Sequence, residues 1–223
     1  MSFIKLLHIH IMQFYSQCGE DKFLYEKYIM PLNLVNPIYL EMGAMDGVNF
    51  TNTYFFEKEL GWTGILIEPH PMNYKKLCIN RPNNKLFNNV ISNDENDVEF
   101  TYFESECLSG ISGVKNTLTE NNIKIFYTKN NEWISNMIDD HLKVEIVKPK
   151  KLSEIVKLSG YDKIDFFSLD VEGHELSVLK SFDWSIPINM FLIENNQDTL
   201  KINELLTNKN YKIIETIGPN TLL

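Results

Sequence analysis

The sequence has few cysteines and no long apolar run. Cys18, Cys78 and Cys107 lie far apart without a C-x-x-C pair, so their spacing predicts neither a zinc site nor a disulfide framework. Such sparse cysteine use is typical of a reducing compartment, and we expect a cytoplasmic protein. No stretch is long enough to span a membrane, and residues 1–15 lack the charged leader, clean apolar run and cleavage site of a signal peptide.

Positive charge is also scarce. The 21 lysines and arginines are outnumbered by 30 acidic residues, which gives a net charge of −9 and a pI near 5.1. This balance argues against a broad phosphate-binding surface and therefore against long nucleic acid as a partner. A hydrophobic content of 43% in 223 residues is sufficient for a single core. We interpret residues 1–223 as one domain, with an N-terminal helical segment at 1–36 and an insertion at about 104–147.

Apolar runs and helical patterns alternate along the chain. Ser16 could cap a first helix that ends at Pro31. Continuous apolar runs indicate strands buried on both faces, and strands that alternate with helices predict a parallel α/β sheet with right-handed crossovers. Residues 221–223 would begin a final antiparallel strand. The expected strands before it cover residues 37–40, 65–68, 85–92, 98–103, 144–147, 163–170, 188–193 and 211–217.

The turn after the first expected strand narrows the kind of ligand. It contains Gly43 and Gly47, which allow a sharp turn and a close approach to a ligand, together with the acids Glu41 and Asp46. The turn departs from G-x-G-x-x-G because Ala44 follows Gly43. Two carboxylates would repel a pyrophosphate but suit a sulfonium and an ammonium group. We therefore predict a pocket for S-adenosylmethionine (SAM) rather than NAD; a turn that only closes a strand–helix corner is the alternative.

Four acids follow or end expected strands: Glu41, Glu68, Asp170 and Glu194. Ligands of open α/β sheets bind beyond the carboxyl ends of the strands. Each acid is costly to bury without a cation or a hydrogen-bond donor, so four at successive strand ends favour a binding site over loop-base pairing with lysines. Glu68 lies about 25 residues after Gly43, where an acid can accept hydrogen bonds from ribose hydroxyls.

Two further segments are candidates for the pocket wall. The adenine of a bound cofactor would lie near Asn89, Val90 and Ser92, beyond the third strand. In the N-terminal segment, Gln17 and Asp21 either line the pocket or belong to a helix that only covers an edge of the domain.

The densest cluster of reactive side chains is D-V-E-G-H-E at residues 170–175. His174 could act as a general base because its unperturbed pKa lies near neutrality, with Asp170 and Glu172 assisting it. The same three residues could instead hold a divalent metal, although their spacing is not diagnostic for one. A third interpretation is that Glu172 and His174 only cap the following helix.

Several motifs together resemble the FkbM-type SAM-dependent methyltransferases. They are E-M-G-A-M-D-G with a following T-N-T at residues 41–53, G-W-T-G-I-L-I-E-P at 61–69, and L-D-V-E-G-H-E at 169–175. The opening S-Q-C-G-E-D-K-F-L at 16–24 is also similar to the N-terminal segment of that family. The order and spacing of the motifs, rather than any one of them, carry the resemblance.

The resemblance implies a Rossmann-like class I methyltransferase fold, with a mostly parallel seven-stranded sheet, helices on both faces and a C-terminal antiparallel hairpin. It implies SAM as the cofactor and methylation of a hydroxyl on a sugar, a glycan or a small metabolite. Asn52 would steady the cofactor loop, Glu68 would bind the ribose, and Asp170 would face the reacting end. The residues implied at the methionine end are Glu41, Gly43, Ala44, Asp46 and Gly47.

Two other functions remain open on the same scaffold. A NAD-linked oxidoreductase is disfavoured by the acids of the first turn and by Ala44. A non-catalytic SAM-binding module would keep Glu41 and Glu68 but make the cluster at Asp170 structural.

Overall fold

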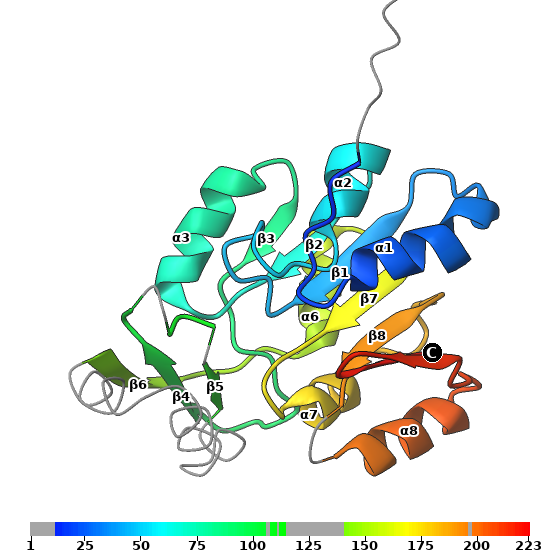
Figure 1. The fold of residues 1–223 in the computed structure, drawn as a ribbon. Helices are drawn as coiled ribbons and strands as arrows, with labels where there is room; N and C mark the ends of the chain where they lie inside the picture. Colours follow the sequence, from blue (N-terminus) through cyan, green and yellow to red (C-terminus); the bar gives the residue numbers. More distant parts are fainter. Residues whose placement is uncertain (1–11, 106–107, 111, 115–140, 196–197) are drawn as a thin grey trace, which may run out of the picture.

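A seven-stranded sheet forms the centre of the molecule (Figure 1). The computed structural model describes residues 12–105, 108–110, 112–114, 141–195 and 198–223. The strand order is β3-β2-β1-β7-β8-β10-β9; the first five strands run parallel, and β10 is antiparallel to both neighbours. The mostly parallel sheet with a C-terminal antiparallel hairpin is thus confirmed. Its strands are β1 (Ile38–Met42), β2 (Thr63–Ile67), β3 (Lys85–Phe87), β7 (Phe166–Leu169), β8 (Phe191–Glu194), β9 (Glu215–Ile217) and β10 (Asn220–Leu222).

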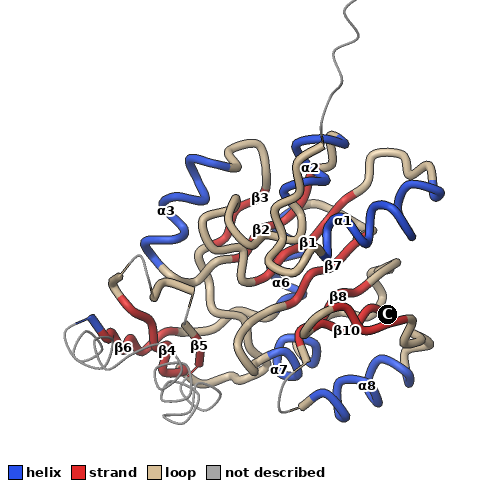
Figure 2. The backbone as a smooth tube through the Cα atoms, viewed as in Figure 1, coloured by secondary structure: helices blue, strands red, loops and turns tan. Residues whose placement is uncertain are grey.

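Helices cover both faces of this sheet (Figures 1 and 2). Successive side chains of a strand point to opposite faces, so Tyr39 and Leu40 of β1 enter different cores. Tyr39 packs in the core of the first three helices, whereas Leu40 packs in the core of the last three. The helices are α1 (Glu20–Leu24), α2 (Tyr54–Leu60) and α3 (Pro71–Asn80) on one face, and α6 (Leu152–Ser159), α7 (Glu175–Lys180) and α8 (Thr199–Asn208) on the other.

The strand register brings several chain segments to one edge of the sheet. Met42 at the end of β1 pairs with Ile67 of β2 and with Leu169 of β7, and Leu169 pairs with Ile193 of β8. The residues that follow these positions therefore lie side by side at this edge. They are Gly43, Glu68, Asp170 and Glu194.

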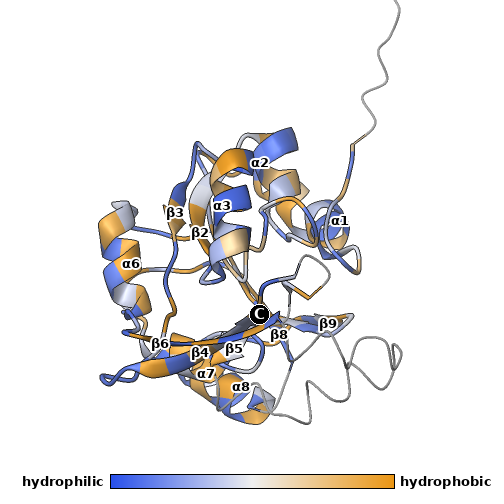
Figure 3. Cartoon of the chain, turned by 90° about the vertical axis from the view of Figure 1, so that its left-hand side faces the viewer, coloured by the Kyte–Doolittle hydropathy of each residue, from blue (hydrophilic) through white to orange (hydrophobic). Residues whose placement is uncertain are grey.

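A second, three-stranded antiparallel sheet lies beside the first (Figure 3). It consists of β5 (Gly113–Val114), β4 (Val98–Phe103) and β6 (Leu142–Val147), in that order. Phe100 and Tyr102 of β4 pack with Val90 and Val114, whereas Ile146 of β6 is exposed. The expected strands at 98–103 and 144–147 exist, and they pair with each other. Most of the insertion expected at 104–147 lies outside the described residues.

The N-terminal segment differs from its expected form. Gly19, not Ser16, directly precedes α1, but the Ser16 hydroxyl accepts from Asp21 N in the first turn at 3.2 Å and donates to the Asp21 carboxylate at 2.7 Å. Pro31 does not end the helical segment, because it lies inside a 3₁₀ turn that follows a π-helical turn. The segment ends at Asn33, whose φ of 44° is left-handed. Residues 1–11 of the expected segment 1–36 lie outside the described residues.

Four expected strands are shorter than predicted. Those expected at 163–170 and 188–193 are observed as Phe166–Leu169 and Phe191–Glu194. The third expected strand ends at Phe87 instead of residue 92, because the chain leaves β2 there and the Val90 carbonyl accepts from Lys150 N. The strand expected from residue 211 begins at Glu215. In the part of the chain that the structure describes, no helix has the length and apolar character needed to cross a membrane.

The C-terminal hairpin also contacts the N-terminal segment. Asn220 Nδ2 donates to Glu20 Oε1 at 3.1 Å, and Glu20 Oε2 accepts from Cys18 N at 2.8 Å. The Tyr28 hydroxyl donates to Glu215 at 3.0 Å, and Lys27 forms an ion pair with the same carboxylate. The two ends of the described chain are therefore joined by side-chain hydrogen bonds.

Candidate active site

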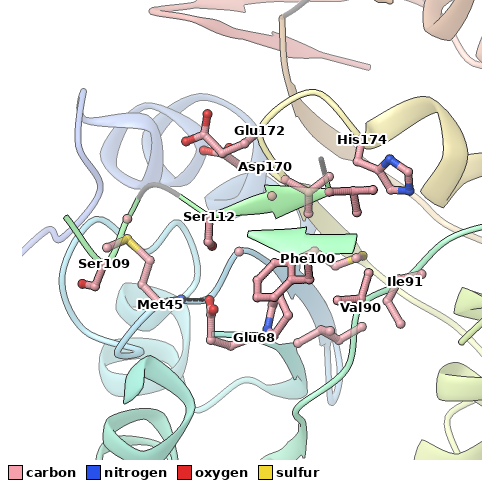
Figure 4. A pocket seen from close by; sticks show the side chains of 18 of the residues that line it. Met45, Glu68, Val90, Ile91, Phe100, Ser109, Ser112, Asp170, Glu172 and His174 are labelled. Carbon is pink, nitrogen blue, oxygen red and sulfur yellow. Dashed lines mark hydrogen bonds between the residues drawn. The ribbon is translucent and has the colours of Figure 1, made fainter. Parts of the chain in front are cut away.

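A cavity of about 330 Å³ lies at the carboxyl edge of the central sheet (Figure 4). One side of the cavity consists of the loops after β1, β2 and β7 and the segment after β3. The other side consists of the small sheet and the turn before β5. Such a position is where open α/β sheets bind ligands. The predicted site residues that line it are Gly43, Glu68, Asn89, Val90, Asp170, Glu172 and His174, and Gln17 lines it as well.

Gly43 is required where the loops after β1 and β7 meet. Its φ is +77°, and a Cβ at this position would lie 2.1 Å from the carbonyl oxygen of Asp170. Only glycine fits, because both the backbone conformation and the space exclude a side chain. Gly47 has a different role: a Cβ there would lie 2.6 Å from Leu77 and 2.7 Å from Arg81, so this glycine packs the loop against α3.

Glu68 is buried at the end of β2 and tied to two backbone amides. Its Oε1 accepts from His70 N and its Oε2 from Met45 N, each at 2.8 Å. Burial raises the pKa of Glu68 to about 8, against the opposing effect of these two hydrogen bonds. Figure 4 shows Glu68 on the pocket wall beside Met45.

Asp170, Glu175 and Glu194 form a compact acidic group. Each offers a carboxylate oxygen, and these oxygens lie within 4.8 Å of one another. Burial raises the pKa of Asp170 well above its usual range, and the charges of Glu194 and Glu175 raise it further. Burial also raises the pKa of Glu194 to about 7. Among the described residues, this trio has the geometry to share a divalent cation, which differs from the trio considered from the sequence.

Glu175 was not singled out from the sequence, yet it shapes the turn after β7. Its Oε1 accepts from Val171 N and from Gly173 N, each at 3.1 Å. This one carboxylate therefore closes the turn that carries Glu172. The signal was present in the sequence, because an acid in the first turn of a helix often binds free backbone amides.

Glu172 and His174 occupy different parts of the pocket. Glu172 has a left-handed φ of 55°, and burial, with the charges of Asp170 and Glu175, raises its pKa to about 8. His174 is buried, its Nε2 has no hydrogen-bond partner among the described residues, and burial lowers its pKa. In Figure 4 the His174 ring points away from Asp170 and Glu172. His174 precedes α7 but its side chain makes no capping hydrogen bond.

Glu41 lies under the loop after β1 and does not line the cavity. Its Oε2 accepts from the hydroxyls of Thr51, at 2.6 Å, and Thr53, at 2.5 Å. Its Oε1 accepts from Asn52 N at 2.7 Å. The carboxyl group thus binds this chain's own loop, and its role as a cofactor ligand stays a prediction.

Asp46 and Asn52 also bind the protein itself. The Asp46 carboxylate accepts from Val48 N at 2.9 Å and from Asn49 N at 2.8 Å. Asn52 Nδ2 donates to the Ser168 hydroxyl of β7 at 2.9 Å. The Asp46 bonds brace the loop internally and the Asn52 bond ties it to the sheet, and the roles of both residues in cofactor binding stay predictions.

The remaining predicted contacts lie outside the cavity wall. Ala44 is buried in the core beneath α2, and Ser92 is buried with its hydroxyl 2.9 Å from Asp94 and 3.0 Å from Ser177. Asp21 accepts from the backbone of Ser16 rather than facing the pocket. Their places in the cofactor or acceptor site stay predictions.

Arg81 is a structural residue that the sequence reasoning missed. It is the sole arginine of the chain and is fully buried. It pairs with Glu57 and donates to Gly47 O at 2.8 Å, to the Tyr39 hydroxyl at 2.7 Å and to Thr53 at 3.2 Å. The single use of arginine among many lysines was the available signal, since its five donors can serve several acceptors at once.

The fold and the pocket define a class of protein. Numbered along the chain, the central strands have the order 3-2-1-4-5-7-6, with the seventh strand antiparallel between the fifth and sixth. The pocket lies at the carboxyl edge and contains the carboxyl groups of Glu68, Asp170 and Glu172. These are the features of a Rossmann-like methyltransferase.

The family follows from a direct comparison. The family model described as "Methyltransferase FkbM domain" matches residues 41–213, well over half of the chain. The chain therefore belongs to the FkbM methyltransferase family. Comparison with curated proteins and with solved structures found no match to the chain.

Proposed function

We propose that this methyltransferase uses SAM and methylates a hydroxyl group of a sugar, a glycan or a small metabolite. The observation that carries the proposal is the acidic lining of the pocket, which ionises readily beside a cation. Glu68, Asp170 and Glu172 line it, and its described lining contains no lysine or arginine. Such a wall suits a ligand with sulfonium and ammonium groups and disfavours a pyrophosphate.

The residues present fit this cofactor. The turn at Gly43 would hold its methionine end, Glu68 would accept hydrogen bonds from its ribose, and Asn89 and Val90 would contact its adenine. Asp170 would face the reacting end. When bound, SAM supplies a methyl group that is already activated on sulfur, so the protein mainly has to align the acceptor and remove one proton.

Proton removal is assigned to Glu172, with Asp170 beside it. Both line the pocket, and His174, the third candidate, has its ring turned away from them (Figure 4). Glu172 must be ionised to accept a proton, and a cationic donor nearby would favour that form. The Glu172 carboxylate would accept the proton of the acceptor hydroxyl.

Calorimetry tests the cofactor. We expect SAM to bind and NADH not to bind; NADH binding without SAM binding would instead support the oxidoreductase. A methyl-transfer screen with labelled SAM, run against glycans and cell extract with and without a chelator, tests the reaction. Tight SAM binding with no transfer to any acceptor would favour a non-catalytic binding module.

A further inference from the structure

Phe50 is an exposed aromatic residue at the pocket. It lines the cavity, and 58% of its surface is accessible. Its φ of 61° is left-handed, a conformation that bulky side chains rarely adopt because it is strained. An exposed aromatic ring in a strained backbone gains nothing for the core, so its position calls for another explanation.

Two carboxylates hold Phe50 in place. Asp46 binds the backbone amide of Asn49 on one side of it, and Glu41 binds the backbone amide of Asn52 on the other. The Asn49 side chain also donates to Asp46 at 2.6 Å. Phe50 therefore lies between two anchored turns, and the ring is presented on a rigid loop.

Two polar side chains accompany the ring. Ser16 forms a parallel bridge with Phe50, which brings the neighbouring exposed Gln17 to the same part of the cavity wall. Glu172 reaches the wall from β7, the strand that pairs with β1. Its φ of 55° is also left-handed, as is the φ of 48° at Met45, so three residues that line the cavity are held in strained conformations.

The acidic composition of the wall restricts what can bind there. The described lining offers carboxyl groups but neither lysine nor arginine, and Arg81 is buried in its own hydrogen-bond network behind the loop. A carboxylate or phosphate on the acceptor would lie near these acids without a compensating cation.

We propose that Phe50, with Gln17 and Glu172, forms an acceptor subsite that takes an uncharged, hydroxyl-bearing ring. The apolar face of the ring lies against Phe50, and its hydroxyls hydrogen-bond to Gln17 and Glu172. The inference rests on the proposed function, because it places an acceptor hydroxyl beside the reacting end. Beyond that function, the inference specifies which residues select the acceptor and which acceptors are rejected.

Saturation-transfer NMR on the protein loaded with S-adenosylhomocysteine tests this subsite. The probes are methyl α-glucopyranoside, methyl α-mannopyranoside and methyl α-fucopyranoside, with methyl glucuronoside as the matched anion. We expect a signal from at least one neutral glycoside and a signal about ten-fold weaker or less from the glucuronoside.

Substitutions at Phe50 connect the signal to the ring. Phe50→Ala should weaken binding of the neutral glycoside about ten-fold, while Phe50→Trp retains it, because the aromatic surface supplies the contact. The matched control is Val35→Ala, which truncates another exposed apolar side chain outside the pocket. Affinity for S-adenosylhomocysteine should stay within about two-fold in all three variants.

Three results would overturn the subsite. They are no signal from any neutral glycoside with the loaded wild type, an equal signal from the glucuronoside, or an unchanged signal in Phe50→Ala. Each leaves cofactor binding intact, so it is distinguishable from failure of the proposed function, in which neither SAM nor its product binds.

Discussion

Gly43 lies so close to Asp170 that a side-chain carbon would sit 2.1 Å from the Asp170 carbonyl oxygen. Gly43→Ala should therefore destabilise the protein through two effects. The left-handed backbone costs alanine about 1–2 kcal/mol. The clash with the Asp170 carbonyl oxygen costs about 1–3 kcal/mol more. Gly160→Ala is the matched control, because its φ of +81° is similar and nothing lies within 4 Å of its Cβ position. Urea unfolding of both variants measures the difference. Equal destabilisation would show that the contact with Asp170 is unimportant.

Stability should fall as the pH rises from about 6.5 to 8.5. Burial raises the pKa of Glu68 and Glu172 to about 8, whereas an unfolded glutamate titrates near 4.5. Between these values the folded state keeps protons that the unfolded chain has lost, so the stabilisation is full below about 4.5 and disappears through pH 8. Burial lowers the pKa of His70 and His174 below 6.5, so their opposite effect is complete before this window.

Thermal unfolding across this window is the measurement. We expect Tm to fall by about 4 °C or more, and by less in Glu172→Gln, which removes one of the acids whose pKa is raised. The control is Glu154→Gln on the exposed side of α6, which should leave the slope as in the wild type. A Tm that rises with pH over the same window would contradict the protonated state of these buried acids.

Binding of SAM should release protons near neutral pH. A cation placed beside Asp170 and Glu172 favours their ionised forms, so protons held in the free protein leave on binding. Calorimetry in phosphate and in Tris should give different enthalpies at pH about 7, and affinity should increase toward pH about 8. Glu172→Gln should release fewer protons. Identical enthalpies in the two buffers would place the cation away from these acids.

The kcat values of two variants should show whether Glu172 or His174 is the general base. Glu172→Gln should lower kcat about 100-fold or more, because general-base catalysis contributes at least that much, with cofactor affinity less affected. His174→Gln keeps a polar side chain in the buried position and should lower kcat less. Initial rates with saturating acceptor and SAM decide between them. Full turnover in Glu172→Gln together with loss in His174→Gln would return the role to the histidine.

Arg81 and Glu57 should be strongly coupled in stability. Arg81→Met should cost about 3–5 kcal/mol, because it removes the cation that pairs with Glu57 and the donor to the Tyr39 hydroxyl. In the double variant with Glu57→Gln the loss should be smaller than the sum of the two single losses. A double-mutant cycle by urea unfolding measures the coupling, and additive losses would show that the pair acts independently.

Much of the site could be predicted because strand ends converge. Glu68 and Asp170 were found from the rule that parallel strands deliver their following residues to one edge, and both line the cavity. Glu41 shows the limit of this rule. Spacing places an acid at a turn, but it does not tell whether its oxygens face a ligand or the loop's own Thr51 and Thr53.

The fold was predictable to a similar depth. Continuous apolar runs identified the buried strands of the parallel sheet, because such runs are needed where both faces are covered. The pairing of β4 with β6 was not predictable, since 98–103 and 144–147 are far apart in sequence and nothing in either segment specifies its partner. The roles of Glu175 and Arg81 were not predicted, because they depend on backbone groups that only the folded turns bring within hydrogen-bonding distance.

The hydrogen bond between Asn220 and Glu20 couples local unfolding at the two ends of the described chain. Glu20 also holds the turn at Cys18, next to Gln17 on the pocket wall. Transient fraying of the terminal hairpin would break the Asn220–Glu20 bond and make the turn at Cys18 more mobile. Backbone amides of the first and last described segments should therefore exchange hydrogen at similar rates. A fusion partner joined after Leu223 would alter the turn beside Gln17 at the pocket.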